Sequence, residues 1–254
     1  MSTTPADKMA KNRELILQLL AKAESTEYPA EAEAFQEHAE RLMVRYGIDM
    51  AQLDAEAGKR GEMREAMVER RYTLRGTYRR VESLGLTAVA RAFKSVVVLE
   101  QAGKNTLSLY LIGAESDVEQ ITRLFDSLRA QVKHALSVWW LQQQRMHWLT
   151  TAEKGRERRQ FHLGFYAGAT GRVEAVYGAE VAAAEAGTEL VLVAREGRAK
   201  EYTRELYPEL KTSLPSRLAH GSADAQRAGK RAGLAADVLP GRNVAAAGRA
   251  AVAS

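Results

Sequence analysis

Apolar side chains recur every three to four positions near the start of the chain, which is the spacing of one face of an α-helix. Leucine and alanine residues form such a stripe and predict a helix over residues 6–23. Pro29 suits the first turn of a second helix, because proline fits best at the start of one. The second stripe reaches Gly47, a residue type that favours left-handed helix caps. We therefore expect a helical hairpin unit at residues 1–60, with a short third helix after a cap at Asp49.

The pattern then changes to short alternating and β-branched runs. Alternation of apolar and charged residues predicts a strand over residues 67–74. Two apolar runs joined by the segment AGKN predict a hairpin, and the later run TELVLVAR predicts one further strand. The remaining expected elements begin with a helix over 78–93 and strands over 95–101 and 106–112. Next comes a helix capped by Ser116 or Asp117, which continues through Trp139 and Trp140 to a polar break at 150–160. The last elements are a helix over 161–186, the strand at 188–195 and a helix that ends at Pro208.

These elements favour the α+β class. The helical hairpin unit would be followed by an α+β domain at residues 63–210, with a small three- or four-stranded sheet and long helices. Residues 211–254 are rich in alanine, glycine and arginine and contain no aromatic residue, so we expect a flexible basic tail there. A weak helix is expected within it at 222–239. Its small residues Ala225, Gly229 and Gly233 would form a ridge that allows close packing.

Charge and composition narrow the class of protein. The formal net charge is +5, but the acidic residues 1–62 cancel the basic residues 63–210, so the excess equals that of the tail. The absence of cysteine excludes disulfides, thiolate nucleophiles and cysteine-type zinc sites. No apolar run approaches the ~20 residues that span a bilayer, and the polar N-terminus is unlike a secretory signal. We therefore expect a cytoplasmic protein with no membrane partner.

The N-terminal unit carries a recognisable motif, "LLAKAEST…EAEAF…HAERLMVRYGID". It resembles the bacterial and phage family called domain of unknown function 2786, over roughly residues 11–50. Later segments are similar to a companion domain that often follows it. These segments are LTAVARAF, IGAESDVEQITRLFDSL, FHLGFYAGATGRV and LVLVAR, which together cover most of residues 81–207. The resemblance implies a domain layout and a phage-related origin, but no activity and no catalytic residue.

Motifs for catalysis are weak. The five histidines form no helical pair with metal-ligand spacing. The glycines at 164, 168 and 171 miss the dinucleotide-binding spacing, and no predicted strand precedes them. The chain has no Gly-x-Ser-x-Gly elbow. Acidic pairs in helix first turns are explained by the helix dipole. We therefore expect no catalytic residue, no bound metal and no cofactor.

The segment RRYTLRGTYRR interleaves arginines with tyrosines, a combination in which guanidinium groups bind phosphates and aromatic rings stack on bases. The basic tail would add salt-sensitive affinity. The same residues are also consistent with a solvated strand face, a helix start and a solubilising tail. The candidate nucleic-acid-binding residues are Arg70, Arg71, Tyr72, Arg75, Tyr78, Arg79, Arg80, Lys230 and Arg231.

Three functions therefore remain open. The first is a non-enzymatic module that binds nucleic acid, or a protein that handles it. The second is a protein-interaction module that docks a partner through the N-terminal helices. The third, a metal-dependent hydrolase, depends only on scattered histidines and glutamates. The tryptophans at 139, 140 and 148 are a further candidate contact surface, although packing in the core explains them equally.

Overall fold

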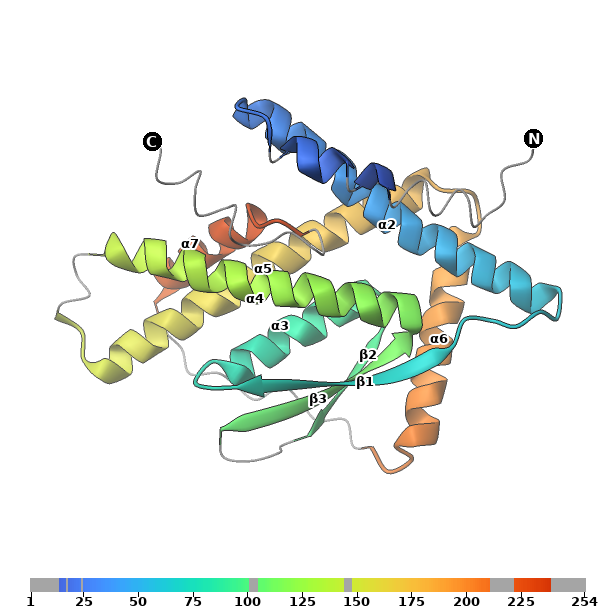
Figure 1. Cartoon of the computed structure of the whole chain (residues 1–254). Coiled ribbons are helices and arrows are strands. Elements are labelled where there is room, and N and C mark those ends of the chain that lie inside the picture. The colour runs from blue at the N-terminus through green and yellow to red at the C-terminus, as the bar shows by residue number, and fades with distance from the viewer. Residues whose placement is uncertain are drawn as a thin grey trace.

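A computed structural model describes residues 14–16, 18–23, 25–100, 105–143, 148–210 and 222–238. A small antiparallel sheet lies beneath a layer of long helices, and the N-terminal helical hairpin projects from the top of this body (Figure 1). The prediction of an α+β fold with an N-terminal hairpin and a three- or four-stranded sheet is confirmed, with three strands among the described residues.

The N-terminal hairpin consists of helical residues 14–16 and 18–23 and of α2 (Pro29–Lys59). Leu19 and Ala39 are the buried centre of a small apolar cluster between these two helices. The predicted cap at Gly47 is wrong, because α2 continues without a break to Lys59. The buried stripe of α2 continues past the glycine through Ile48 and Ala51, so burial outweighs the ~1 kcal/mol cost of glycine in a helix.

The sheet has the strand order β1-β3-β2, with both pairings antiparallel. The strands are β1 (Met67–Arg75), β2 (Val96–Glu100) and β3 (Thr106–Ala114). The turn predicted at AGKN covers residues 101–104, which lie outside the described residues. The three leucines of β3 at 107, 109 and 111 are buried and face the helices, since alternate residues of a strand point to the same side.

Two helices, α3 (Arg79–Ala92) and α4 (Glu115–Leu141), cover this face of the sheet, and α5 (Thr151–Ala183) packs on both of them to complete the main core. The helix α5 is buried on several sides along its middle, from Gln160 to Val173. The opposite face is met by α6 (Thr188–Leu206) and the residue after it, Tyr207, whose ring lies 6.0 Å from that of Tyr110 on β3.

Three sequence predictions in this part of the chain are wrong. The run at 188–195 is the start of α6 and not a strand. The segment at 150–160 is the N-terminal end of α5 and not a break, because Thr150 and Glu153 form a reciprocal capping box. The helix α4 begins after Ala114, so Ser116 and Asp117 lie in its first turn and are not its cap.

The helix predicted within 222–239 is confirmed as α7 (Ala223–Leu234), and it packs along α5. Its ridge of small residues meets the glycines of α5. A Cβ atom on Gly229 would lie 2.0 Å from the carbonyl oxygen of Phe161, and one on Gly164 would lie 2.0 Å from that of Gln226. Residues 222–238 are therefore part of the packed body, which corrects the expectation of a mobile tail over that stretch.

Within the described ranges, no helix combines the length and the apolar character needed to cross a bilayer.

Candidate nucleic-acid interface

The tyrosine of the β1–α3 turn connects the predicted binding segment to the central helix. The ring of Tyr78 stacks on that of His162 in α5, with centroids 4.4 Å apart and an interplanar angle of 21°. Gly76, with φ of 95°, makes the turn that brings Tyr78 to this place, since a positive φ of this kind suits glycine. Arg79 and Arg80, which follow Tyr78, thereby lie beside the N-terminal half of α5.

The N-terminal half of α5 carries its own cations, in the segment where the sequence pattern predicted a break. Arg158 lies over the ring of Trp140 in α4 at 4.3 Å from the centroid, which is a cation–π contact. One turn later, Phe161 packs on Trp139, with centroids 5.1 Å apart. The last turns of α4 and the first turns of α5 thus form one packed end of the molecule.

The helix α7 adds further cations beside the same stretch of α5. The backbone of Lys230 lies against Gly164 and Gly168, and the side chains of Lys230 and Arg231 are exposed. In Figure 1 the β1–α3 turn, the start of α5, the end of α4 and α7 all lie on the left-hand side. We call the cations gathered here the basic end; they are Arg79, Arg80, Arg156, Arg158, Arg159, Lys230 and Arg231.

Several cations of the basic end have no acidic partner. Among the described residues, Arg80, Lys230 and Arg231 form no ion pair. Nearby acids are already engaged: Glu153 caps α5, and Asp224 pairs with Arg227. Unpaired surface cations of α3 and α7 produce a positive field that attracts phosphate.

The structure places two predicted residues of β1, Arg71 and Arg75, on the face of the sheet opposite to Tyr72. Arg71 points to the opposite face of the sheet from Tyr72, where its Nη2 donates a hydrogen bond of 3.0 Å to Ser108 Oγ. Arg70 lies in the middle of the edge strand β1, opposite Leu111 of β3. The sequence segment therefore does not form one surface, because consecutive residues of a strand point to opposite faces.

The predicted stacking tyrosines have partners inside the protein. The ring of Tyr72 meets Phe125 edge-to-face at 5.6 Å, and its hydroxyl donates to Asp126 and accepts from Arg129. Burial, followed by the hydrogen bond to Asp126, raises the pKa of Tyr72. One face of Tyr78 is covered by His162. Both tyrosines therefore contribute to the shape and packing of the basic end.

His162 is the most deeply buried titratable group beneath the basic end, with 1% of its surface exposed. Burial first, and then the charge of Lys133, lower the pKa of His162 to about 4. Neither ring nitrogen has a hydrogen-bond partner among the described residues. The imidazole is therefore neutral near pH 7 and supports Tyr78 as a flat apolar surface.

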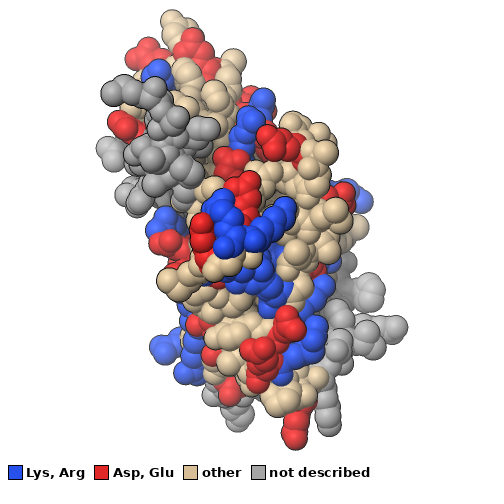
Figure 2. Space-filling view, turned by 90° about the vertical axis from the view of Figure 1, so that its right-hand side faces the viewer, with Lys and Arg blue, Asp and Glu red and all other residues tan. Residues whose placement is uncertain are grey.

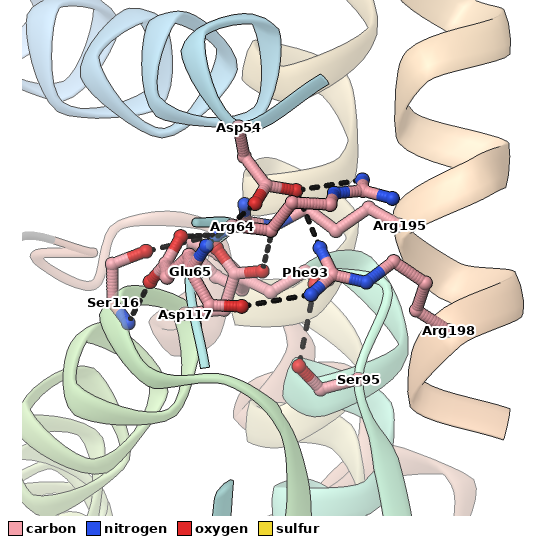
Figure 3. A network of polar contacts seen from close by, with 9 residues as sticks. All are labelled: Asp54, Arg64, Glu65, Phe93, Ser95, Ser116, Asp117, Arg195 and Arg198. Atoms are coloured by element: carbon pink, nitrogen blue, oxygen red, sulfur yellow. Dashed lines mark hydrogen bonds and ion pairs between the residues drawn. The ribbon is translucent and has the colours of Figure 1, made fainter. Parts of the chain in front are cut away.

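A second polar cluster lies at the other end of the molecule, between α2, α4 and α6 (Figure 3). The carboxylate of Asp54 accepts from Arg64 at 2.9 Å, from Arg198 at 2.5 Å and from the backbone of Glu65 at 2.7 Å. Arg195 donates to Asp117 at 2.7 Å. Each carboxylate in the cluster has an arginine partner, so its charges balance and favour a structural role.

The same cluster supplies the missing cap of α4. Ala114 stands at the N-cap position and has no polar side chain, but Glu65 Oε1 accepts the backbone N–H of Ser116 at 2.7 Å. Burial raises the pKa of the Asp117 carboxyl, and Arg195 opposes the shift. On the face formed by α6 and the end of α2, basic side chains gather near the centre and acidic side chains lie around them (Figure 2).

A groove of about 520 Å³ lies between α3, α5 and α6. Lys94, which has φ of 57°, lines it together with Tyr177 and Glu189. Arg91 on its rim pairs with Glu174 at 3.3 Å. None of the predicted binding residues lines this groove, and its charges are mixed.

The N-terminal motif is matched by a family model. Residues 15–50 match the family described as "Protein of unknown function (DUF2786)". The resemblance predicted from the LLAKAEST…RYGID motif is therefore confirmed, whereas the companion domain and the phage-related origin stay predictions. No curated protein and no solved structure matches the chain. The DUF2786 segment contains none of the predicted binding residues.

The cations of α5 at 156, 158 and 159 were not among the binding residues predicted from the sequence. The signal that could have found them is the Thr-x-x-Glu pattern at Thr150 and Glu153, which marks a helix start. A helix that begins there places the following arginines on a regular helical surface, whereas the predicted break would place them in a loop.

Proposed function

We propose that this protein binds nucleic acid through the basic end and performs no catalytic step there. The observation that carries the proposal is the stacking of Tyr78 on His162, which joins the arginines of the β1–α3 turn to those of α5. Lys230 and Arg231 of α7 extend the same surface. Phosphate attraction of this kind is independent of base sequence and falls steeply with salt.

The geometry narrows the predicted set of binding residues. Arg79, Arg80, Lys230 and Arg231 remain candidates for phosphate contact, and the arginines of α5 join them. Arg71 is excluded from this surface by its contact with Ser108 on the other face of the sheet. Tyr72 and Tyr78 act as supports of the surface and not as stacking platforms.

The proposal is tested by measuring binding of a labelled oligonucleotide by fluorescence anisotropy over a range of salt concentrations. Wild-type protein is expected to bind at ~50 mM salt and to lose most of this affinity by ~200 mM. The double variant Lys230→Ala, Arg231→Ala should weaken binding and reduce the slope of log K against log salt by about two.

A matched control removes two exposed cations of α2, which is not part of the basic end. The double variant Arg41→Ala, Lys59→Ala carries the same change of charge. It should retain the salt slope of the wild type. Absence of binding by the wild type at ~50 mM salt, or an equal loss in the control, would overturn the proposal.

Docking of a protein partner by the N-terminal hairpin is a second candidate. Tyr28, at the turn of the hairpin, is 68% exposed, and the small apolar cluster of the hairpin is separate from the main core. A partner held there would resist high salt and would be released by Tyr28→Ala. The hydrolase alternative gains no support, since the described residues contain no group of three or more His, Asp or Glu able to hold a metal ion.

A further inference from the structure

An exposed tryptophan adjoins the basic end and has no structural explanation. Trp148 is 88% exposed and lies two residues before Thr150, the N-cap of α5. The exposed ring is a large flat apolar surface beside charged side chains, and such a ring is available to stack on a flat partner. Trp139, by contrast, packs on Phe161 and belongs to the core.

The cations of α5 follow Trp148 closely along the chain. The helix rises by ~1.5 Å per residue, so Arg156 lies about 9 Å along the axis from the cap at Thr150. Trp140 on α4 already holds the guanidinium of Arg158 over its ring at 4.3 Å. This end of the molecule therefore combines free cations with aromatic faces, one of them already paired with an arginine.

A surface that combines cations with an exposed aromatic ring distinguishes single-stranded from duplex nucleic acid. Cations alone attract the phosphates of duplex and single strand alike. An exposed aromatic ring adds affinity when a base face is free, and in a duplex the base faces are occupied by their neighbours. We infer that the basic end prefers single-stranded nucleic acid, with Trp148 as a stacking platform for an unpaired base. This inference rests on the proposed function and specifies its substrate.

The test compares a labelled oligodeoxythymidine with a hairpin duplex of similar charge at the same low salt. Wild-type protein should bind the single strand more tightly and show quenched tryptophan fluorescence. Trp148→Ala should weaken binding of the single strand roughly tenfold, because one base–aromatic stack is lost, and should leave duplex binding unchanged. Trp148→Phe should retain most of the affinity and lose most of the quenching.

Leu141→Ala is the matched control. Leu141 is 86% exposed at the end of α4, so this variant removes another exposed apolar side chain from the same end of the molecule. It should bind both ligands like the wild type. Circular dichroism checks that each variant is folded, which the exposure of both residues leads us to expect.

The outcomes separate the two proposals. If the wild type binds duplex as tightly as single strand, or if Trp148→Ala weakens both equally, the preference for single strands is wrong while nucleic-acid binding stands. If the wild type binds neither ligand, the proposed function fails as well.

Discussion

Gly229 packs so closely on Phe161 that a Cβ atom on the glycine would lie 2.0 Å from the phenylalanine carbonyl oxygen. The same relationship repeats one turn later, where a Cβ atom on Gly233 would lie 2.0 Å from the carbonyl oxygen of Phe165. The backbones of α5 and α7 thus touch, and this contact places Lys230 and Arg231 at the basic end.

Substitution of a glycine in this contact between α5 and α7 should destabilise the fold. Gly229→Ala requires the two helices to separate, and we expect a loss of about 3 kcal/mol in the free energy of unfolding, measured by urea denaturation. Gly171→Ala on α5 is the control, because no atom lies within 4 Å of the place that its new Cβ atom would take. That change should stabilise the helix by up to ~1 kcal/mol. Equal changes in the free energy of unfolding for the two substitutions would contradict the close packing of α5 on α7.

The buried carboxylate of Asp54 should be important for holding α2 to α6. Asp54→Ala leaves Arg64 and Arg198 without their shared partner. We expect a loss of about 2 kcal/mol, below the usual cost for a buried pair because both arginines reach solvent. Glu37→Ala removes a solvent-exposed pair with Arg41 and should cost no more than ~0.5 kcal/mol. Thermal denaturation monitored by circular dichroism compares the two variants.

His162 should make stability depend on pH. Its folded pKa of about 4 lies below the ordinary value of 6.5, so between these values the unfolded chain binds more protons than the folded one. The contribution of His162 to the free energy of unfolding is therefore fully present above pH ~6.5 and is lost progressively as pH falls towards ~4. The loss is on the order of 3 kcal/mol.

His162→Phe keeps an aromatic ring beneath Tyr78 and removes the titrating group. Denaturant unfolding at several pH values should show a flatter dependence for this variant between pH ~6.5 and ~4. Lys133→Met, which removes the second cause of the shift, should flatten the dependence to a smaller degree. Parallel curves for wild type and His162→Phe would show that this histidine is not the source.

The capping box should keep the first turn of α5, and with it Arg156, in place. Thr150→Ala removes the hydroxyl that accepts from the backbone of Glu153, at an expected cost of ~1 kcal/mol. Thr150→Ser keeps an equivalent oxygen and should behave like the wild type. The free energy of unfolding is the measurement, and an equal loss in both variants would point to the methyl group and not to the cap.

The wrong prediction of a strand at 188–195 shows why the sequence pattern was insufficient to predict α6. Its buried positions include Thr188, Leu192, Arg195 and Thr203, which repeat at helical spacing but are mostly polar. Leu190 and Val193 are the exposed ones. A hydrophobic pattern cannot reveal a helix whose inner face is held by ion pairs, so the β-branched run alone favoured a strand.

The candidate site was predicted in part. Tyr78, Arg79 and Arg80 lie at the basic end, because the turn at Gly76 is a local feature that the sequence encodes. Arg71 does not lie there, because the direction of its side chain depends on which face of β1 packs against the helices. The contribution of α5 depended on contacts between Tyr78 and His162, more than eighty positions apart in the chain.

Local sequence patterns were sufficient for the N-terminal hairpin, the three strands, the long helices α3 and α4, the small-residue ridge of α7 and the DUF2786 motif. Each of these depends on spacing between near neighbours, which fixes local conformation. The packed fold was needed to show that the glycines of α5 receive that ridge and that cations from three separate elements share one surface. Those relationships depend on packing between distant segments, where the match of two surfaces, and not the propensity of either, sets the outcome.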